Sequence, residues 1–209
     1  MSLAQELWHA NTDLAQACLE HPFVQGLADG SLPRPAFAYF IGQDAFFLDA
    51  FARAYCIAAA RAPDLSGLRA FHELAGGVIN ELGLHEHYAA QWELDIRQVT
   101  PGVTTRRYTD FLLATAWRYD AGMTAAAMAP CMRLYAFIGA ELAKRGKTEH
   151  HYTRWITTYS DPAFQDLAGR IEGLVDRYAS DAPETRAAYR YAMLCERDFF
   201  QAAWEERAD

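Results

Sequence analysis

The sequence has little of what marks an exported or membrane-spanning protein. Its N-terminal stretch lacks a basic segment followed by an apolar run, so no signal peptide is visible. No stretch reaches the roughly 18 uninterrupted apolar residues of a spanning helix. Cysteine is scarce, and the few cysteines lie far apart without a C-x-x-C pair, at Cys18, Cys56, Cys131 and Cys195. Such thiols are typical of a reducing cytosol, so we expect a cytoplasmic protein with no disulfide framework and no membrane partner.

Positive charge is also in the minority. The chain has 19 Lys and Arg against 27 Asp and Glu, which gives a formal net charge of -8. Binding to nucleic acid needs basic surface that replaces the counterions around phosphates. No basic stripe and no recognised reading helix is present, so we expect no nucleic-acid partner.

Linkers, repeats and low-complexity segments are absent as well, so we predict one domain over residues 1–209. Apolar residues recur with helical periodicity, and β-branched residues rarely alternate with polar ones, which predicts an all-α helical bundle. Gly76-Gly77 leaves a break in the third helix open. The predicted helices cover residues 3–20, 34–60, 64–97, 104–121, 123–145, 148–158, 161–179 and 183–207.

One aspartate interrupts an apolar helix face. Asp44 falls three residues after Ile41 and four before Leu48, inside the stripe that Phe47 and Phe51 continue. A carboxylate in that position is unfavourable unless it is hydrogen-bonded or paired. It is therefore either a structural aspartate tied to a buried partner or the wall of an interior cavity, and we favour the cavity.

A cysteine follows a proline in a long apolar segment. Pro130 cannot donate a backbone hydrogen bond, so either a helix kinks there or a helix begins with Pro130. In the second case the helix dipole would favour the reactive thiolate of Cys131. Tyr135 lies one turn later on the same face. Taken alone, a cysteine among apolar residues is more often an inert core thiol.

Two further acidic positions invite different interpretations. Glu196 shares a helix face with Met193 and Phe199, so it is either an inward carboxyl that can donate protons or a solvated helix edge. Glu81 and His85 resemble half of a carboxylate-bridged metal site. The doubled Glu-x-x-His signature is absent, so a solvated surface is the better interpretation and we expect no metal.

Several segments, taken together and in order, resemble the TenA-type aminopyrimidine aminohydrolases, also called thiaminase II. The similar segments are HPFVQGLADGSLP, FAYFIGQDAFFLDAFARAY with its Gln-Asp pair, APCMRLYAFIG with its Pro-Cys pair, WITTYSDPAF, and CERDFFQAAW with its glutamate. The resemblance implies the haem-oxygenase-like helical fold and a homotetramer. It also implies cleavage of thiamin or deamination of an aminomethylpyrimidine, without a cofactor.

The same resemblance implies roles for individual residues. Cys131 would add to the pyrimidine ring as the nucleophile, and Glu196 would carry protons to the leaving group and from water. Asp44 would hold the ring's amino group and adjacent nitrogen. The remaining residues would contact the ring or line the pocket: Tyr108, Tyr135, Tyr159, Phe47 and Phe51.

Two positions depart from the family pattern, and both bear on which pyrimidine is preferred. Phe47 stands where many relatives have tyrosine, and Met132-Arg133 follows Cys131 where aromatic residues are common. Two rival functions remain open. One is a metal-dependent oxidase of the same fold, with Glu81, His85, Asp44 and Glu196 as ligands. The other is a non-catalytic pyrimidine-binding regulator.

Overall fold

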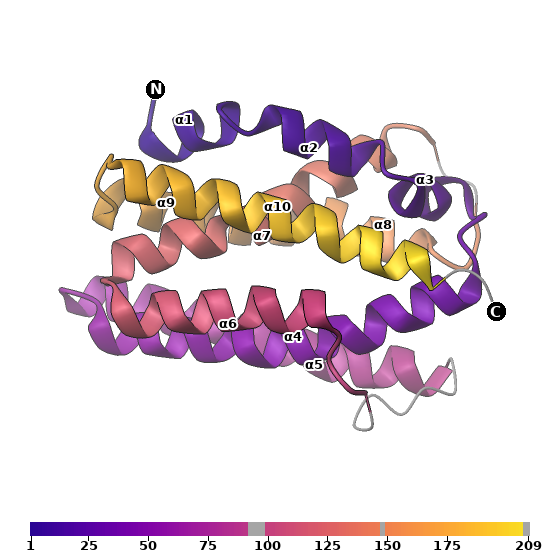
Figure 1. The fold of residues 1–209 in the computed structure, drawn as a ribbon, viewed down its shortest axis with the longest axis horizontal. Helices are drawn as coiled ribbons and strands as arrows, with labels where there is room; N and C mark the ends of the chain where they lie inside the picture. Colours follow the sequence, from indigo (N-terminus) through magenta and orange to yellow (C-terminus); the bar gives the residue numbers. More distant parts are fainter. Residues whose placement is uncertain (92–98, 147–148, 207–209) are drawn as a thin grey trace.

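The computed structural model describes residues 1–91, 99–146 and 149–206. For residues 83–91 it describes the backbone alone. All regular structure in these ranges is helical, which confirms the predicted all-α bundle (Figure 1). The helices are α1 (Leu3–His9), α2 (Thr12–Leu19), α3 (Pro22–Asp29), α4 (Arg34–Arg61), α5 (Leu65–Gln91), α6 (Val103–Arg118), α7 (Ala121–Ala143), α8 (Thr153–Ser160), α9 (Pro162–Tyr178) and α10 (Pro183–Glu205).

The N-terminal region differs from the prediction. The single helix expected over 3–20 is two helices, separated at Ala10 and Asn11, where the Asn11 side chain donates to the Leu7 carbonyl at 2.8 Å. Helix α3 was not predicted at all. Its N-cap is His21, whose ring nitrogen accepts a hydrogen bond from the Phe23 amide at 3.2 Å, and its C-cap is Gly30 with φ of 82°. Histidine is not a usual capping residue, which hid this short helix from a search for caps.

Other boundaries lie close to the predicted ones. Helix α5 runs without a break through Gly76-Gly77, and its predicted end at 92–97 lies outside the described residues. Helix α8 starts at Thr153, five residues later than predicted, and 147–148 fall outside the described part. Helices α3, α4, α9 and α10 each have a proline at the first or second helical position. Proline is tolerated there because the first N–H groups of a helix have no helical acceptor.

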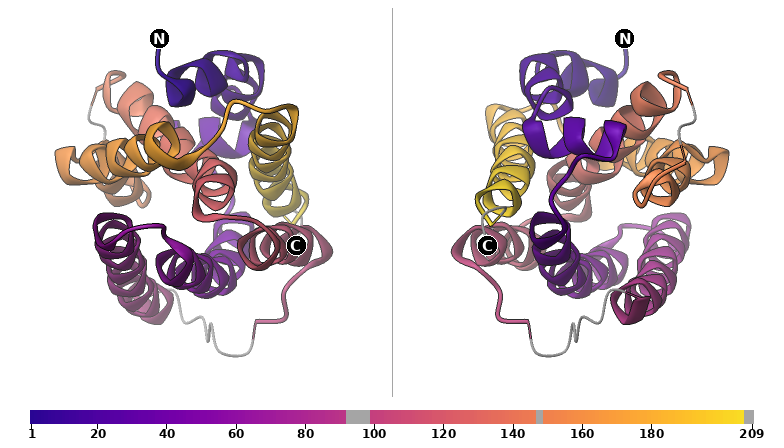
Figure 2. Two further views of the ribbon diagram at one scale, coloured as in Figure 1. Left: turned by 90° about the vertical axis from the view of Figure 1, so that its left-hand side faces the viewer. Right: turned by 90° about the vertical axis from the view of Figure 1, so that its right-hand side faces the viewer.

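The bundle places α4 and α7 where they can share a core. Figure 2 shows α4, α5 and α6 on one side, α1 to α3 on the opposite side, and α7, α9 and α10 between them. Helix α4 packs against α5, α6, α7 and α10, which explains why its buried residues extend around most of its surface. The buried apolar residues of the described part form one contiguous core.

Helix α7 is long and apolar enough to cross a membrane by composition alone. However, 78% of its most apolar window is buried inside the bundle. Its apolar character is therefore explained by its central position between α9 and α10.

Candidate active site

In the Gln43-Asp44 pair of α4, Asp44 lines a cavity and Gln43 binds the start of α6. Asp44 is 5% exposed and lines a cavity inside the bundle. Its neighbour Gln43 accepts hydrogen bonds from the Gly102 amide at 2.9 Å and the Thr105 hydroxyl at 2.5 Å. It also donates to the Thr100 carbonyl at 3.2 Å. Gln43 therefore fixes the start of α6 beside α4, a positioning role that sequence analysis missed.

Helix α7 presents Cys131 from its middle and not from its end. Pro130 lies inside the helix, so the alternative in which a helix begins at Pro130 is wrong. Its missing N–H leaves the Ala126 carbonyl without its helical partner, and the surrounding core holds the helix together nonetheless. The dipole effect is confined to the first turn, so it gives the Cys131 thiol no activation.

The electrostatics of Cys131 disfavour the free thiolate. Burial raises the pKa of the thiol well above its usual value, and the negative charges of Glu196, Asp44 and Glu81 raise it further. The thiol donates a hydrogen bond to the Glu196 carboxylate. A base next to the sulfur is therefore required for Cys131 to act as a nucleophile, and Glu196 is in place for that task.

Glu196 faces inward from α10, as one of its two interpretations predicted. It is 2% exposed, and the Tyr108 hydroxyl donates to Oε1 at 2.6 Å. Burial raises the pKa of Glu196 to about 8, the Tyr108 and Cys131 hydrogen bonds lower it, and the charge of Asp44 raises it. A carboxyl with this pKa exchanges a proton near neutral pH.

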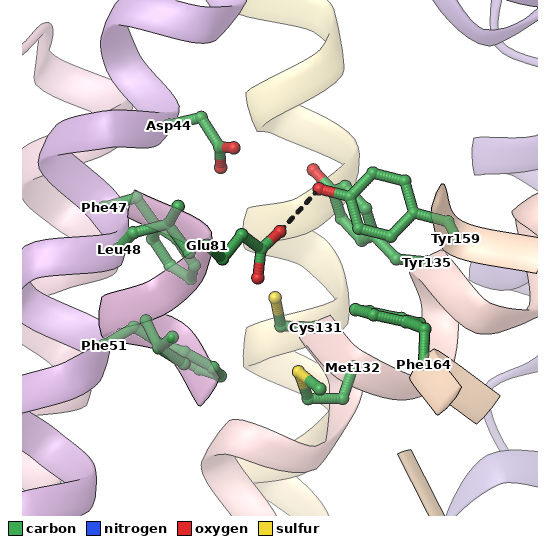
Figure 3. A pocket seen from close by; sticks show the side chains of 11 residues that line it. Asp44, Phe47, Leu48, Phe51, Glu81, Cys131, Met132, Tyr135, Tyr159 and Phe164 are labelled. Carbon is green, nitrogen blue, oxygen red and sulfur yellow. Dashed lines mark hydrogen bonds between the residues drawn. The ribbon is translucent and has the colours of Figure 1, made fainter. Parts of the chain in front are cut away.

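Aromatic side chains form most of the remaining wall of this inner cavity (Figure 3). Tyr135 of α7 contacts Tyr159 of α8 edge-on, with ring centroids 4.9 Å apart. Phe47 of α4 stacks on Phe51 at 5.2 Å and lies 4.8 Å from Tyr108. The full lining is Asp44, Phe47, Leu48, Phe51, Val78, Glu81, Cys131, Met132, Tyr135, Tyr159 and Phe164.

Six of the eight predicted site residues line the inner cavity directly: Asp44, Phe47, Phe51, Cys131, Tyr135 and Tyr159. The other two lie behind its wall. Tyr108 and Glu196 are outside the lining, where Tyr108 binds Glu196 and Glu196 binds Cys131. The free volume is about 20 Å³, which is room for about one water molecule. Side chains of the wall must therefore move when a ring enters.

The sequence predicted a solvated surface position for Glu81, with half of a metal site as the alternative. The structure instead places it half-buried in the cavity lining, where its Oε1 accepts from the Tyr159 hydroxyl at 3.0 Å. Its spacing with His85 drew attention away from the cavity, and the side chain of His85 lies outside the described ones. Among the described residues, no group of three His, Cys, Asp or Glu side chains is arranged to hold a metal ion.

The departures from the family pattern fall at different distances from the cavity. Phe47 and Met132 both line it, so both bear on what it admits. Arg133 points away: its guanidinium lies 4.5 Å from the Trp8 ring centroid and 3.3 Å from the Glu172 carboxylate. The Arg133 departure is therefore explained by packing of α1 and α9 on α7.

The arrangement of helices in this bundle is the haem-oxygenase-like fold. A domain with that fold from Shewanella denitrificans superposes with a TM-score of 0.78 at 11% identity, covering 99% of this chain and 93% of that one. The chain belongs to the TENA/THI-4/PQQC family, whose model matches residues 8–206. This confirms the resemblance noted in the sequence.

Individual relatives agree with this membership. An aminopyrimidine aminohydrolase from Halalkalibacterium halodurans is 30% identical over 99% of this chain and 97% of its own length. A TenA homologue from P. horikoshii OT3 has a TM-score of 0.91 at 25% identity, covering 99% of this chain and 100% of that one. A thiamine biosynthesis multifunctional protein ThiED from Corynebacterium efficiens is 37% identical over 94% of this chain. The chain spans only 28% of that ThiED protein's length.

Proposed function

We propose that the protein is a cysteine-dependent hydrolase of thiamin metabolism that acts on 4-amino-2-methylpyrimidines. It replaces the substituent on the 5-methylene group by hydroxyl, either the amine of an aminomethylpyrimidine or the thiazolium of thiamin. The observation that carries this proposal is the hydrogen bond from the Cys131 thiol to Glu196 at the wall of the inner cavity. The name of the Halalkalibacterium relative, aminopyrimidine aminohydrolase, supports the same activity.

The first half of the reaction starts with the thiol proton. Glu196 takes this proton as the Cys131 sulfur forms a bond to the ring carbon beside the 5-position. The ring's double-bond pair shifts toward the methylene carbon, and the bond from methylene to the substituent nitrogen breaks. The nitrogen keeps the electron pair. A neutral amine takes the proton from Glu196 as it leaves, whereas the cationic thiazolium nitrogen leaves uncharged and Glu196 then releases its proton to solvent.

Water completes the exchange. It adds to the methylene carbon while Glu196 accepts a proton from it, and the electron pair returns to the ring. The carbon–sulfur bond then breaks, and Cys131 regains its proton from Glu196. Atoms and charges balance without a metal or an added cofactor.

The other polar and aromatic groups orient the ring. Asp44 accepts a hydrogen bond from the ring's amino group, as a buried carboxylate can, and one from the adjacent ring nitrogen when that nitrogen is protonated. Phe47, Phe51, Tyr135 and Tyr159 enclose the ring faces. Tyr108 acts through Glu196, because its hydroxyl is already donated to that carboxylate.

The direct test is ammonia release from 4-amino-5-aminomethyl-2-methylpyrimidine, with thiamin assayed in parallel and Cys131→Ser as the comparison. We expect Cys131→Ser to lose turnover by a factor of at least about 1000 while its affinity for the ligand is largely kept, because the sulfur acts in the bond-making step. The ratio of the two wild-type rates identifies the preferred substrate. Turnover retained in Cys131→Ser would rule out this mechanism.

We also propose that residues 1–209 form one domain and that the protein is cytoplasmic and assembles as a homotetramer. The described cysteines are all free thiols, which fits a reducing compartment. Large apolar side chains on α6 are exposed, among them Val103 at 86% and Trp117 at 69%. Such surface suits contact with further copies of the chain.

A further inference from the structure

Phe164 separates two spaces in the molecule. It lies in the first turn of α9, and in Figure 3 its ring points into the inner cavity from the side opposite to Phe47 and Phe51. On its other side lies an outer hollow of about 460 Å³ between α5, α8 and α9. Among the described residues, Phe164 and Glu81 line both the inner cavity and this outer hollow. One layer of side chains therefore divides the two spaces.

The Phe164 ring borders empty space, unlike the rings of the far wall. Phe47 lies 4.8 Å from the Tyr108 ring, and Phe51 lies 4.9 Å from the Tyr55 ring, so both are backed by further aromatic side chains. Behind Phe164 is the outer hollow. A side chain next to a void loses few contacts when it changes rotamer. Rotation of Phe164 alone would join the inner cavity to the hollow.

The backbone around Phe164 is held in place. Asp161 caps the N-terminus of α9 through a hydrogen bond of 2.8 Å from a first-turn amide. The Gln165 side chain donates to the Ala136 carbonyl of α7 at 2.9 Å and to the Tyr159 carbonyl of α8 at 3.0 Å. These bonds tie the start of α9 to both neighbouring helices. The boundary therefore opens by rotation of the Phe164 side chain and not by movement of α9.

The two spaces differ in chemistry. The inner cavity is lined mostly by aromatic and aliphatic side chains, which suits a flat pyrimidine ring. A polar group placed in the outer hollow keeps hydrogen-bonding partners that it would lose against an apolar wall. The hydrogen-bonding side chains in the lining of the hollow include Asn80, Arg154, Thr157, Thr158 and Asp161.

We infer that the outer hollow is the subsite for large, polar substituents on the 5-methylene group of a bound pyrimidine, and that Phe164 controls access to it. The inference rests on the proposed function and adds to it the place of the leaving group. The pyrimidine ring occupies the inner cavity beside Cys131, and Phe164 rotates away from it. A heterocycle with a hydroxyalkyl chain, such as the thiazolium of thiamin, then extends past Phe164 into the hollow. A single amine is small enough to need no such space.

Gly77 allows the outer hollow to be filled without changing the inner lining. It lines the hollow from α5 and is not part of the inner cavity wall. A Cβ added to Gly77 would meet no described atom of another element within 4 Å, so the fold accepts a larger side chain there. Gly76 is equally open and lines neither space. Gly76→Leu is therefore the matched control for Gly77→Leu.

The test compares the Kd of thiamin with the Kd of 4-amino-5-aminomethyl-2-methylpyrimidine by calorimetry, in a Cys131→Ser background that prevents turnover. Both ligands carry a positive charge on the substituent, so the comparison isolates size. We expect Gly77→Leu to raise the ratio of the thiamin Kd to the aminomethylpyrimidine Kd at least about tenfold, because the leucine occupies the space of the thiazolium. Gly76→Leu leaves this ratio unchanged.

Phe164→Ala is expected to change the same ratio in the opposite direction. Thiamin no longer has to displace the ring, whereas the smaller ligand gains nothing from the opening. The ratio of the two Kd values therefore falls below that of the Cys131→Ser background. Phe164→Leu, which keeps part of the side-chain volume, replaces Phe164→Ala if that variant does not fold.

Equal ratios in Gly77→Leu and Gly76→Leu would overturn the inference, and so would absence of thiamin binding in the wild type and the Cys131→Ser background alike. A ratio that does not fall in the Phe164 variant would contradict the control of access by Phe164. Wild-type turnover is measured separately. A failure of the proposed function shows as absence of ammonia release, whereas the inference is read from binding alone.

Discussion

At the scale of single residues, the proposed mechanism depends on one proton shared between Cys131 and Glu196. The thiol cannot ionise by itself at neutral pH, because burial and three neighbouring carboxylates raise its pKa. Glu196 can accept the proton only when it is ionised, and its pKa is raised to about 8. Tyr108 sets this balance, since its hydrogen bond stabilises the carboxylate.

The first residue-scale prediction concerns pH. In the wild type, kcat/KM rises with pH and levels off above about 8, where Glu196 is ionised in the free enzyme. Tyr108→Phe removes a hydrogen bond that lowers the pKa of Glu196, so the rise moves to higher pH. The shift is measured from kcat/KM against pH for the wild type and Tyr108→Phe with the same substrate. Any titration of the substrate itself affects both profiles equally.

Tyr189→Phe is the matched control for Tyr108→Phe. Tyr189 is also buried, and its hydroxyl has no hydrogen-bond partner among the described residues. We expect Tyr189→Phe, which removes this hydroxyl, to leave the pH dependence of kcat/KM unchanged. A profile of Tyr108→Phe that coincides with the wild type would contradict the role of Glu196 as the base.

Residue patterns predicted part of this site. Asp44 and Glu196 were found because each interrupts an apolar helix face, and both are buried. Cys131 was indicated mainly by the resemblance, since a thiol fits an apolar face without any penalty. Glu81 was missed because its spacing with His85 suggested a surface pair, although it follows the buried Leu74 and Val78 on one helix face.

At the scale of elements, the position of α8 depends on a glycine of α7. A Cβ on Gly139 would fall inside the contact distance of the Tyr159 carbonyl group, so the two helices meet only because Gly139 lacks a side chain. This approach places the Tyr159 ring beside Tyr135. The geometry of the cavity wall is thus tied to one small residue.

Gly139→Ala is therefore expected to lower the free energy of unfolding by about 1–3 kcal/mol, because α8 must shift away from α7. Gly169→Ala is the control: this glycine is exposed in α9 with nothing described within 4 Å of the added Cβ. That variant gains about 0.5–1 kcal/mol from helix propensity. Urea unfolding of both variants measures the contrast, and equal stabilities would refute the close approach.

At the scale of the whole molecule, the site reduces stability. The pKa of Glu196 is about 8 in the folded state against 4.5 as the ordinary value. Between these values the folded protein binds more protons than the unfolded chain, so this group's contribution to stability falls as pH rises from about 4.5 to 8. A buried carboxylate that must ionise for function opposes folding.

Glu196→Gln is expected to abolish turnover and to be more stable than the wild type at alkaline pH. The difference in free energy of unfolding, variant minus wild type, should grow by roughly 4 kcal/mol between about pH 5 and pH 8.5. Glu184→Gln, on an exposed turn of the same helix, should show no such trend. Thermal and urea unfolding at several pH values measure it, and a difference independent of pH would count against the raised pKa.

The sequence by itself determined the helical class, because the period of its apolar residues repeats along nearly the whole chain. It also determined most helix starts, since prolines and caps act locally, and it carried the family in the order of its motifs. Only the tertiary structure decided that Pro130 lies within α7, that Gln43 holds the start of α6, and that Glu81 faces Cys131. These facts depend on contacts between helices distant in sequence, and local periodicity contains no information about which helices meet.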